Sequence, residues 1–247
     1  MTERVSGLQN AIHIQDISKA FKKKQVIKPL SLQIERESIY GLLGPSGCGK
    51  TTLIKMIVGM MKCDAGEITV LGKRVPDASL LAEIGYMAQS DALYTELTGR
   101  QNLEFFAKLY GMSKSEQKMR IEYAAEIVQL SNDLDVSVFA YSGGMKRRLS
   151  LAIALIQNPK ILILDEPTVG IDPLLKQSVW KELERLKKEE QKTILITTHV
   201  MDEAERCDQI GMLREGQIIA SGTPVELKTQ YNAITFDEVF LKIGGGF

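Results

Sequence analysis

The sequence contains few cysteines, and they are too few for a disulfide framework. Cys48, Cys63 and Cys207 are the three cysteines among 247 residues, which favours a reducing cytosol over an oxidising compartment. Residues 1–5 lack the apolar core of a signal peptide, and no run approaches the ~18 apolar residues of a membrane span. If the protein works at a membrane, we therefore expect another chain to cross it.

The sequence also has no excess of charge of either sign. Lysine plus arginine and aspartate plus glutamate each number 31, so no overall field attracts nucleic acid or anionic lipid. We therefore expect no nucleic-acid partner. Basic clusters at residues 22–24, 146–148 and 187–188 are interpreted as solvated faces. No internal repeat or low-complexity tract is present, and the length suffices for a substantial core.

Residues 44–51 form a glycine-rich motif that is typical of nucleoside triphosphate binding. They read Gly-Pro-Ser-Gly-Cys-Gly-Lys-Thr and fit the P-loop pattern. The glycines let successive backbone N–H groups curve around phosphate oxygens, while Lys50 reaches the β- and γ-phosphates and Thr51 can ligate Mg²⁺. The apolar run 39–43 predicts a buried strand before the motif, and residues 52–61 predict a helix after it. The nucleotide-binding residues predicted here are Gly44, Pro45, Ser46, Gly47, Cys48, Gly49, Lys50, Thr51 and Thr52.

A second buried strand is predicted over residues 161–164, and it ends in two carboxylates. Such a strand can deliver Asp165 to the Mg²⁺ shell of a bound nucleotide. The adjacent Glu166 can orient and deprotonate the attacking water. Taken alone, this pattern also fits a strand that ends at an acidic surface. Beside a P-loop, the nucleotide site is the favoured interpretation.

Residues 142–148 contain a second candidate anion site. Ser142, Gly143 and Gly144 precede an apolar helix predicted over residues 149–156, and N–H groups at a helix start favour bound anions. One chain therefore holds two phosphate-binding devices that are far apart in the sequence.

The hydrophobic periodicity changes twice along the chain. Alternating segments at 11–17, at 30–34 and around Gly72 predict antiparallel strands with one solvated face. Helical periodicity follows up to about residue 157. Strand–helix alternation then returns over residues 161–198, which implies a parallel sheet with helices on its faces. We expect an α/β fold: a P-loop NTPase core with a mostly parallel sheet and flanking helices, an N-terminal antiparallel β subdomain and an inserted α-helical subdomain.

The segment from Tyr141 to Met145, read together with the P-loop and the two carboxylates, resembles the signature sequence of the ATP-binding subunit of ATP-binding cassette (ABC) transporters. The commonest form of that signature begins with leucine and ends with glutamine. The departures at Tyr141 and Met145 resemble the drug, antibiotic and small-ion exporter branch. Residues 235–241 resemble the short C-terminal helix of the same branch, although a generic amphipathic end fits them equally well.

The resemblance covers nearly the whole chain and implies a single ABC ATPase domain over residues 1–247. We expect residues 1–92 and 158–228 to form the RecA-like and β core. Residues 93–157 are expected to form the helical signature subdomain, and residues 229–247 a C-terminal tail.

Four further residues match functional positions of that family. Phe21 lies where the family places an aromatic ring that stacks on adenine, with a plain core phenylalanine as the alternative. Gln89 corresponds to the glutamine loop, which touches Mg²⁺ or water and borders the membrane subunit. Asp172 lies in a segment that resembles the D-loop at the subunit boundary. His199, directly after the strand predicted over residues 193–198, corresponds to the switch histidine that contacts the γ-phosphate.

The resemblance further implies a head-to-tail dimer, with each ATP held between the P-loop of one chain and the signature of the other. The single P-loop implies a dimer of two chains. An identical chain is the favoured second ABC subunit, and a different cassette stays open. The implied catalytic residues are Lys50, Gln89, Glu166 and His199. The implied Mg²⁺ ligands are Thr51, Gln89 and Asp165. The implied nucleotide contacts outside the P-loop are Phe21, Ser142, Gly143, Gly144 and Asp172.

We therefore expect an ATP-hydrolysing subunit that energises export through a separate polytopic membrane permease, on the inner face of the cell membrane. The alternative is a non-transport ABC ATPase that acts on ribosomes or DNA. Only 92 residues (142 − 50) separate Lys50 from Ser142, without sustained heptads, which argues against the coiled-coil DNA-maintenance members. Direction of transport follows only from the exporter-branch resemblances, so an importer stays open, and cargo choice is expected to belong to the permease.

Cys48 lies at the start of the helix predicted after the P-loop, two residues from Lys50. Both features predict a lowered thiol pKa. We therefore expect a maleimide to block ATP hydrolysis at this residue, and bound MgATP to protect it.

Overall fold

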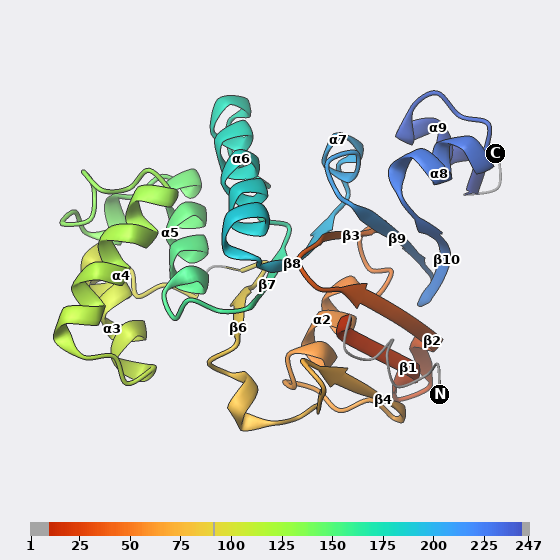
Figure 1. The fold of residues 1–247 in the computed structure, drawn as a ribbon, viewed down its shortest axis with the longest axis horizontal. Coiled ribbons are helices and arrows are strands. Elements are labelled where there is room, and N and C mark those ends of the chain that lie inside the picture. Colours follow the sequence, from red (N-terminus) through yellow and green to blue (C-terminus); the bar gives the residue numbers. More distant parts are fainter. Residues whose placement is uncertain (1–9, 91, 244–247) are drawn as a thin grey trace. The chain divides into compact units, whose positions relative to one another are not determined.

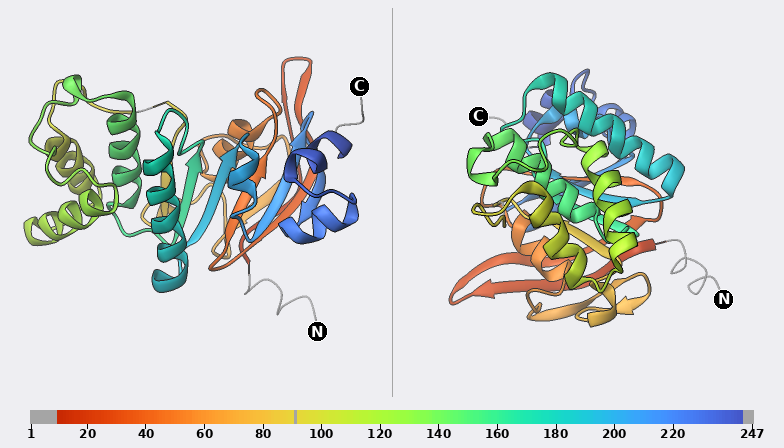
Figure 2. Two further views of the ribbon diagram at one scale, coloured as in Figure 1. Left: turned by 90° about the horizontal axis from the view of Figure 1, so that it is seen from above. Right: turned by 90° about the vertical axis from the view of Figure 1, so that its left-hand side faces the viewer.

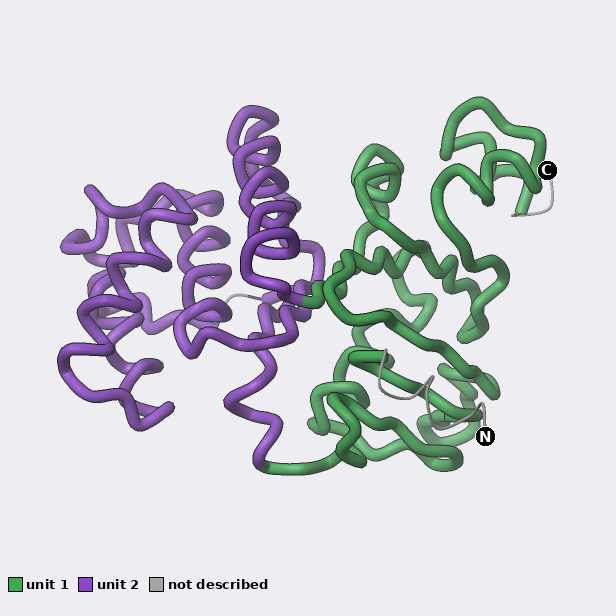
Figure 3. Tube along the Cα trace, in the orientation of Figure 1, with its two compact units in different colours: residues 1–78, 193–247 green, residues 79–192 purple. Residues whose placement is uncertain are grey.

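The computed structural model describes residues 10–90 and 92–243. The predictions for residues 1–5, and for the last four residues of the tail, lie outside the described residues. Two compact units make up the chain: residues 1–78 with 193–247 form unit 1, and residues 79–192 form unit 2 (Figure 3). The single-domain organisation and its predicted inner boundaries stay predictions.

Unit 1 contains an antiparallel sheet in the order β2-β1-β4-β5 (Figure 1). Its strands are β1 (Asn10–Phe21), β2 (Lys24–Glu35), β4 (Ala65–Val70) and β5 (Lys73–Arg74). In β2, buried Leu30, Leu32 and Ile34 alternate with exposed residues, because successive side chains point to opposite faces of a strand. The predicted antiparallel strands with one solvated face are confirmed.

A second set of strands in unit 1 has the order β10-β9-β3-β8. Its members are β3 (Ile39–Leu43), β8 (Thr193–Thr198), β9 (Gln209–Arg214) and β10 (Gln217–Gly222). β3 runs parallel to both β8 and β9, whereas β10 is antiparallel to β9. All residues of β3 and β8 are buried, as expected for parallel strands covered on both faces. The carboxyl end of β3 leads directly into the P-loop.

The helices of unit 1 are α2 (Lys50–Ile57), α7 (Met201–Ala204), α8 (Pro224–Gln230) and α9 (Phe236–Ile243). α2 ends earlier than the predicted residue 61, because Val58 closes the helix and Gly59 has a left-handed backbone with φ 78°. α8 packs on β10, and α9 packs on α7 and α8 (Figure 2). The C-terminal segment predicted from residue 235 is therefore helical.

Unit 2 contains the parallel pair β6 (Ile84–Met87) and β7 (Ile161–Asp165). Its helices are α3 (Gly99–Leu109), α4 (Lys114–Ile127), α5 (Gly143–Leu155) and α6 (Pro173–Glu190), with short 3₁₀ segments η1 (Ala78–Leu80) and η2 (Val138–Ala140). α3, α4 and α5 pack on one another (Figure 2). This bundle confirms the helical periodicity predicted between the two groups of strands.

Capping fixes where the first two helices of the bundle begin. Thr98 and Gln101 form a capping box at α3, and Ser113 and Glu116 form another at α4. Each box satisfies backbone donors that a helix start leaves without intrahelical partners. Across the described residues 10–90 and 92–243, no helix combines the length and the apolar character needed to cross a membrane.

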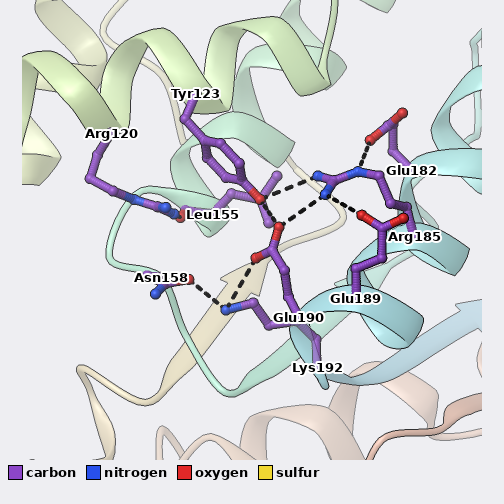
Figure 4. A network of polar contacts seen from close by, with 9 residues as sticks. All are labelled: Arg120, Tyr123, Leu155, Asn158, Glu182, Arg185, Glu189, Glu190 and Lys192. Carbon is purple, nitrogen blue, oxygen red and sulfur yellow. Dashed lines mark hydrogen bonds and ion pairs between the residues drawn. The ribbon is translucent and has the colours of Figure 1, made fainter.

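A network of polar side chains joins α4, the end of α5 and the end of α6 (Figure 4). Arg120 donates hydrogen bonds to the carbonyl oxygens of Ile156 and Leu155, at 3.1 and 2.6 Å. Tyr123 donates to Glu190, which also pairs with Arg185. Burial, with Glu190 as a smaller contribution, raises the pKa of Tyr123. The network fixes the helical bundle to α6 inside unit 2.

Candidate functional site

The P-loop of unit 1 connects β3 to α2 through backbone conformations that favour glycine. Gly47 and Gly49 have φ values of 78° and 116°, in the left-handed region that side chains rarely adopt. A Cβ atom at Gly44 would lie 2.2 Å from the carbonyl oxygen of Leu213. Gly49 is the N-cap of α2 and has no side chain with which to cap it. The start of α2 is thereby left open to an anion.

Lys50 is buried, and its ammonium group lies over the loop that precedes it. The Nζ atom donates to the carbonyl oxygens of Gly44 and Pro45, at 2.6 and 3.2 Å. Thr51 and Thr52 follow in the first turn of α2 and are half-buried. The three residues thus lie at the helix start, where the motif predicts phosphate and metal contacts.

A cleft of about 450 Å³ lies beside the loop. Its walls contain the P-loop residues 45–48, residues 24–26 and 28 of the first hairpin, and residues 214–216. The walls carry three basic side chains and one carboxylate, and this excess of positive charge favours a polyanionic ligand. Phe21, which pairs with Lys24 across the hairpin, is 45% exposed. The alternative interpretation of Phe21 as a plain core residue is therefore wrong.

The prediction of a lowered Cys48 thiol pKa is wrong. Its side chain is buried, and burial raises the thiol pKa more than the nearby Lys50 ammonium lowers it. The helix start and the lysine were read correctly from the sequence, but the sequence does not show how tightly the loop closes over the sulfur atom. Gly44 is close to it, because a Cβ there would lie 2.7 Å from Sγ.

In unit 2, two buried carboxylates stand at the end of β7. Asp165 is 1% exposed and Glu166 is 8% exposed. Glu166 has a left-handed backbone with φ 54°, which is uncommon for a residue with a side chain and typical of strained functional positions. The Nε2 atom of Gln89, just beyond β6, donates to Oε2 of Glu166 at 3.3 Å. The structure thus brings Gln89 and Glu166 together.

The signature segment forms the start of α5. Ser142 is the N-cap, and its Oγ accepts a hydrogen bond from the backbone N–H of Met145 at 3.2 Å. A Cβ atom at Gly143 would meet no described atom within 4 Å, and one at Gly144 would make only ordinary contacts. The fold of this chain therefore does not require glycine at either position.

Sequence reasoning missed one residue of this region. Arg147 was assigned to a solvated basic face, but it is buried and donates to backbone carbonyl oxygens at the ends of β6 and β7. The local sequence gives no signal for this burial, because Arg147 stands between Lys146 and Arg148 in a basic run. Arg148, its neighbour, is half-buried and donates to the carbonyl oxygen of Gln129 at 2.8 Å.

The two remaining predicted site residues lie at element ends. Asp172 caps α6, with Oδ1 accepting from the N–H of Leu175 at 3.0 Å. His199 follows β8 directly and is exposed. Both positions leave the side chain at a surface where a ligand or a second chain can reach it.

Comparison with known proteins decides the family. The model of the ABC transporter family matches residues 27–169, which is more than half of the chain and includes the P-loop, Gln89, the signature and both carboxylates. The chain belongs to the ABC transporter family. This cassette is an ATPase, and ATP-driven transport is its function, as the sequence predicted.

Two curated relatives are the Nod factor export ATP-binding protein I of Rhizobium etli and that of Rhizobium meliloti. The cassette is 43% identical to the first over 88% of its own length and 69% of the relative's. It is 46% identical to the second, over 87% of its own length and 64% of the relative's. The cassette thus spans about two thirds of the length of these relatives.

Two solved structures have the same fold. One is the ATP-binding subunit of an ABC transporter, with a TM-score of 0.86 and 28% identity over 95% of the cassette and 99% of that chain. The other is a dimeric ATP-binding cassette in a post-hydrolysis state, bound to ADP and Pi, with a TM-score of 0.79 and 25% identity over 86% of the cassette and 98% of that chain. The predicted α/β fold with a P-loop NTPase core is confirmed.

Proposed function

We propose that this cassette energises export through a separate membrane-spanning permease, by ATP-driven dimerisation on the inner face of the membrane. Two observations support export: the two relatives described are named as export ATP-binding proteins, and the signature departs from its commonest form at Tyr141 and Met145. The observation that carries the ATPase mechanism is the hydrogen bond from exposed Gln89 to buried Glu166 at the ends of β6 and β7.

The residues present fit MgATP. The P-loop supplies left-handed glycines and an uncapped helix start, and the adjacent cleft carries an excess of basic side chains. Carboxylate and hydroxyl oxygens are ligands that Mg²⁺ prefers, and Asp165 and Thr51 provide one of each. When bound, Mg²⁺ neutralises charge on the phosphates. Gln89 is a further metal contact in this proposal.

Each side chain has a role set by its chemistry. The Lys50 ammonium, now on two loop carbonyl oxygens, moves to the β- and γ-phosphate oxygens. The Glu166 carboxylate accepts a proton from the attacking water. His199 donates a hydrogen bond to the γ-phosphate. Phe21 is exposed and available to stack on adenine.

The signature contacts the ATP of the partner chain in this proposal. Gly143 and Gly144 have room for a side chain within their own chain, so the reason for glycine there lies outside it. A backbone without side chains lets a phosphate from another subunit approach the start of α5. Asp172 lies at the subunit boundary. The dimeric solved cassette supports this arrangement.

The sequence also left open a non-transport ABC ATPase that acts on ribosomes or DNA, and the match to the ABC transporter family disfavours this alternative. The balanced charge of 31 basic and 31 acidic residues disfavours a nucleic-acid surface. The experiment that separates the two is a pull-down of tagged Glu166→Gln cassette with MgATP from gently solubilised membranes. A stoichiometric polytopic membrane protein supports the transporter subunit. Ribosomal proteins or nucleic acid without a membrane protein would favour the alternative.

A further inference from the structure

Arg147 lies on the second turn of α5, five residues after the N-cap, and its guanidinium group is buried. Its Nη1 atom donates to the carbonyl oxygens of Ala88 and Gln89, at 2.8 and 3.0 Å. Its Nη2 atom donates to the carbonyl oxygens of Glu166, at 2.7 Å, and of Asp165. One side chain thus contacts two backbone segments that are about 75 residues apart in the sequence.

These two segments are the ones that carry Gln89 and Glu166. Each follows one strand of the parallel pair β6 and β7, so each leaves the sheet as a loop without the strand ladder to hold it. A planar guanidinium group has five N–H donors in a fixed fork and can bridge several carbonyl oxygens, whereas an ammonium group is a compact charge on a flexible stem. Arginine is therefore the side chain that suits this position.

The helix that carries Arg147 is itself tightly held. α5 packs on β6, and a Cβ atom at Gly85 would lie 2.0 Å from the carbonyl oxygen of Ala154. Close contact of this kind fixes the packing distance between α5 and β6. Arg147 therefore projects from a rigid support toward the two loops.

We infer that Arg147 is a positioning residue for ATP hydrolysis: it fixes the loops of Gln89 and Glu166 relative to each other, and so aims the Glu166 carboxylate. The left-handed backbone of Glu166 persists only where its surroundings enforce it, and the hydrogen bond from Arg147 to the Glu166 carbonyl oxygen is one such restraint. This inference rests on the proposed role of Glu166 as the base that activates water.

The test compares Arg147→Lys with Arg120→Lys as a matched control. Arg120 also donates to two backbone carbonyl oxygens at the opposite end of α5, those of Leu155 and Ile156, and Figure 4 shows Arg120 beside Leu155. Both variants lose guanidinium–carbonyl contacts in unit 2, but only one loses them at the catalytic loops. Steady-state ATP hydrolysis, equilibrium binding of MgATP and backbone amide exchange of the cassette without nucleotide are measured for each.

We expect Arg147→Lys to lower kcat by about 10- to 100-fold, the scale of a misplaced catalytic group, while the Kd for MgATP changes less than about threefold, since the P-loop contacts are intact. The rate of amide exchange should increase more in the peptides that contain Gln89 and Glu166 than in other peptides of unit 2. Arg120→Lys should leave kcat and those two peptides unchanged. For Arg147→Ala, added guanidinium ion should restore part of the lost turnover.

An unchanged kcat for Arg147→Lys, or faster exchange spread evenly over unit 2, would overturn the inference and leave Arg147 as a stabilising residue only. Glu166→Gln is measured beside it. If Glu166→Gln retains turnover, the proposed role of Glu166 is wrong, whatever Arg147→Lys does. If Glu166→Gln is inactive but Arg147→Lys is not, only the Arg147 inference is wrong.

Discussion

Gln89 and Glu166 are 77 residues apart in the sequence, and their side chains are joined by a hydrogen bond of 3.3 Å between Nε2 and Oε2. They meet because β6 and β7 are parallel neighbours whose carboxyl ends lie at the same edge. The amide group restrains the direction of one carboxylate oxygen. A base for a bound water requires a carboxylate that is held in a fixed direction.

The Glu166 carboxylate should be essential for hydrolysis but not for binding. We expect Glu166→Gln to hydrolyse ATP at least ~100-fold more slowly, because an amide cannot accept the proton from water. Affinity for MgATP should be retained, and the variant should accumulate as a dimer with ATP. Phosphate release measures turnover, a binding titration measures the affinity for MgATP, and size-exclusion chromatography measures dimer formation. Near-normal turnover would show that Glu166 is not the base.

Besides the metal contact proposed for it, Gln89 should act on turnover through Glu166. If it does, Gln89→Ala lowers turnover in an otherwise normal cassette, and adds little to the loss already caused by Glu166→Gln. Residues that act as one unit show this non-additivity in a double-mutant cycle. The turnover of the two single variants and of the double variant measures this non-additivity. Fully additive losses would mean that Gln89 acts on its own, for example on the metal.

Gly144→Ala should separate folding from function. Its Cβ atom would lie 3.8 Å from the nearest described atom, and alanine favours a helix over glycine by up to about 1 kcal/mol. We expect the free energy of unfolding in urea to stay the same or rise by up to about 1 kcal/mol. ATP-dependent dimerisation should nevertheless be lost, because the methyl group obstructs the partner's phosphate. Loss of stability without loss of dimerisation would contradict the proposed contact between chains.

Cys48 should react slowly with maleimide at pH 7. Burial raises its thiol pKa above the ordinary value, so less thiolate is present at neutral pH than for a free cysteine. The rate of modification should therefore increase with pH until the pH passes the raised pKa. Cys63 is half-exposed and should be modified first. Intact-mass measurements over time, with Cys63→Ser as the control, follow each thiol. Equal rates of modification for the two cysteines would contradict this expectation.

Gly85→Ala should destabilise the cassette by about 1 to 3 kcal/mol or more, the usual cost of overpacking. The added methyl group would lie 2.0 Å from a backbone oxygen of α5, and this backbone can yield only if the helix shifts. Gly143→Ala is the matched control, because its methyl group meets no described atom within 4 Å. Urea unfolding of both variants measures the difference. Equal midpoints would show that α5 is free to move on β6.

Local signals in the residue pattern predict several parts of this protein. The P-loop spacing, the apolar strand before Asp165 and the serine–glycine start of α5 each depend on neighbouring residues, so the residue pattern predicts both the element and its chemistry. The family resemblance then supplied roles for Phe21 and His199, which no local pattern gives.

The burial of each group and the meeting of distant segments become visible in the folded chain. The thiol of Cys48 has a raised pKa because it is buried, and nothing in the motif shows that burial. Arg147 looks like part of a basic surface cluster, yet it is buried against the carbonyl oxygens of two loops. Burial and long-range backbone contacts arise from packing of the whole chain, and a residue pattern does not encode them one position at a time.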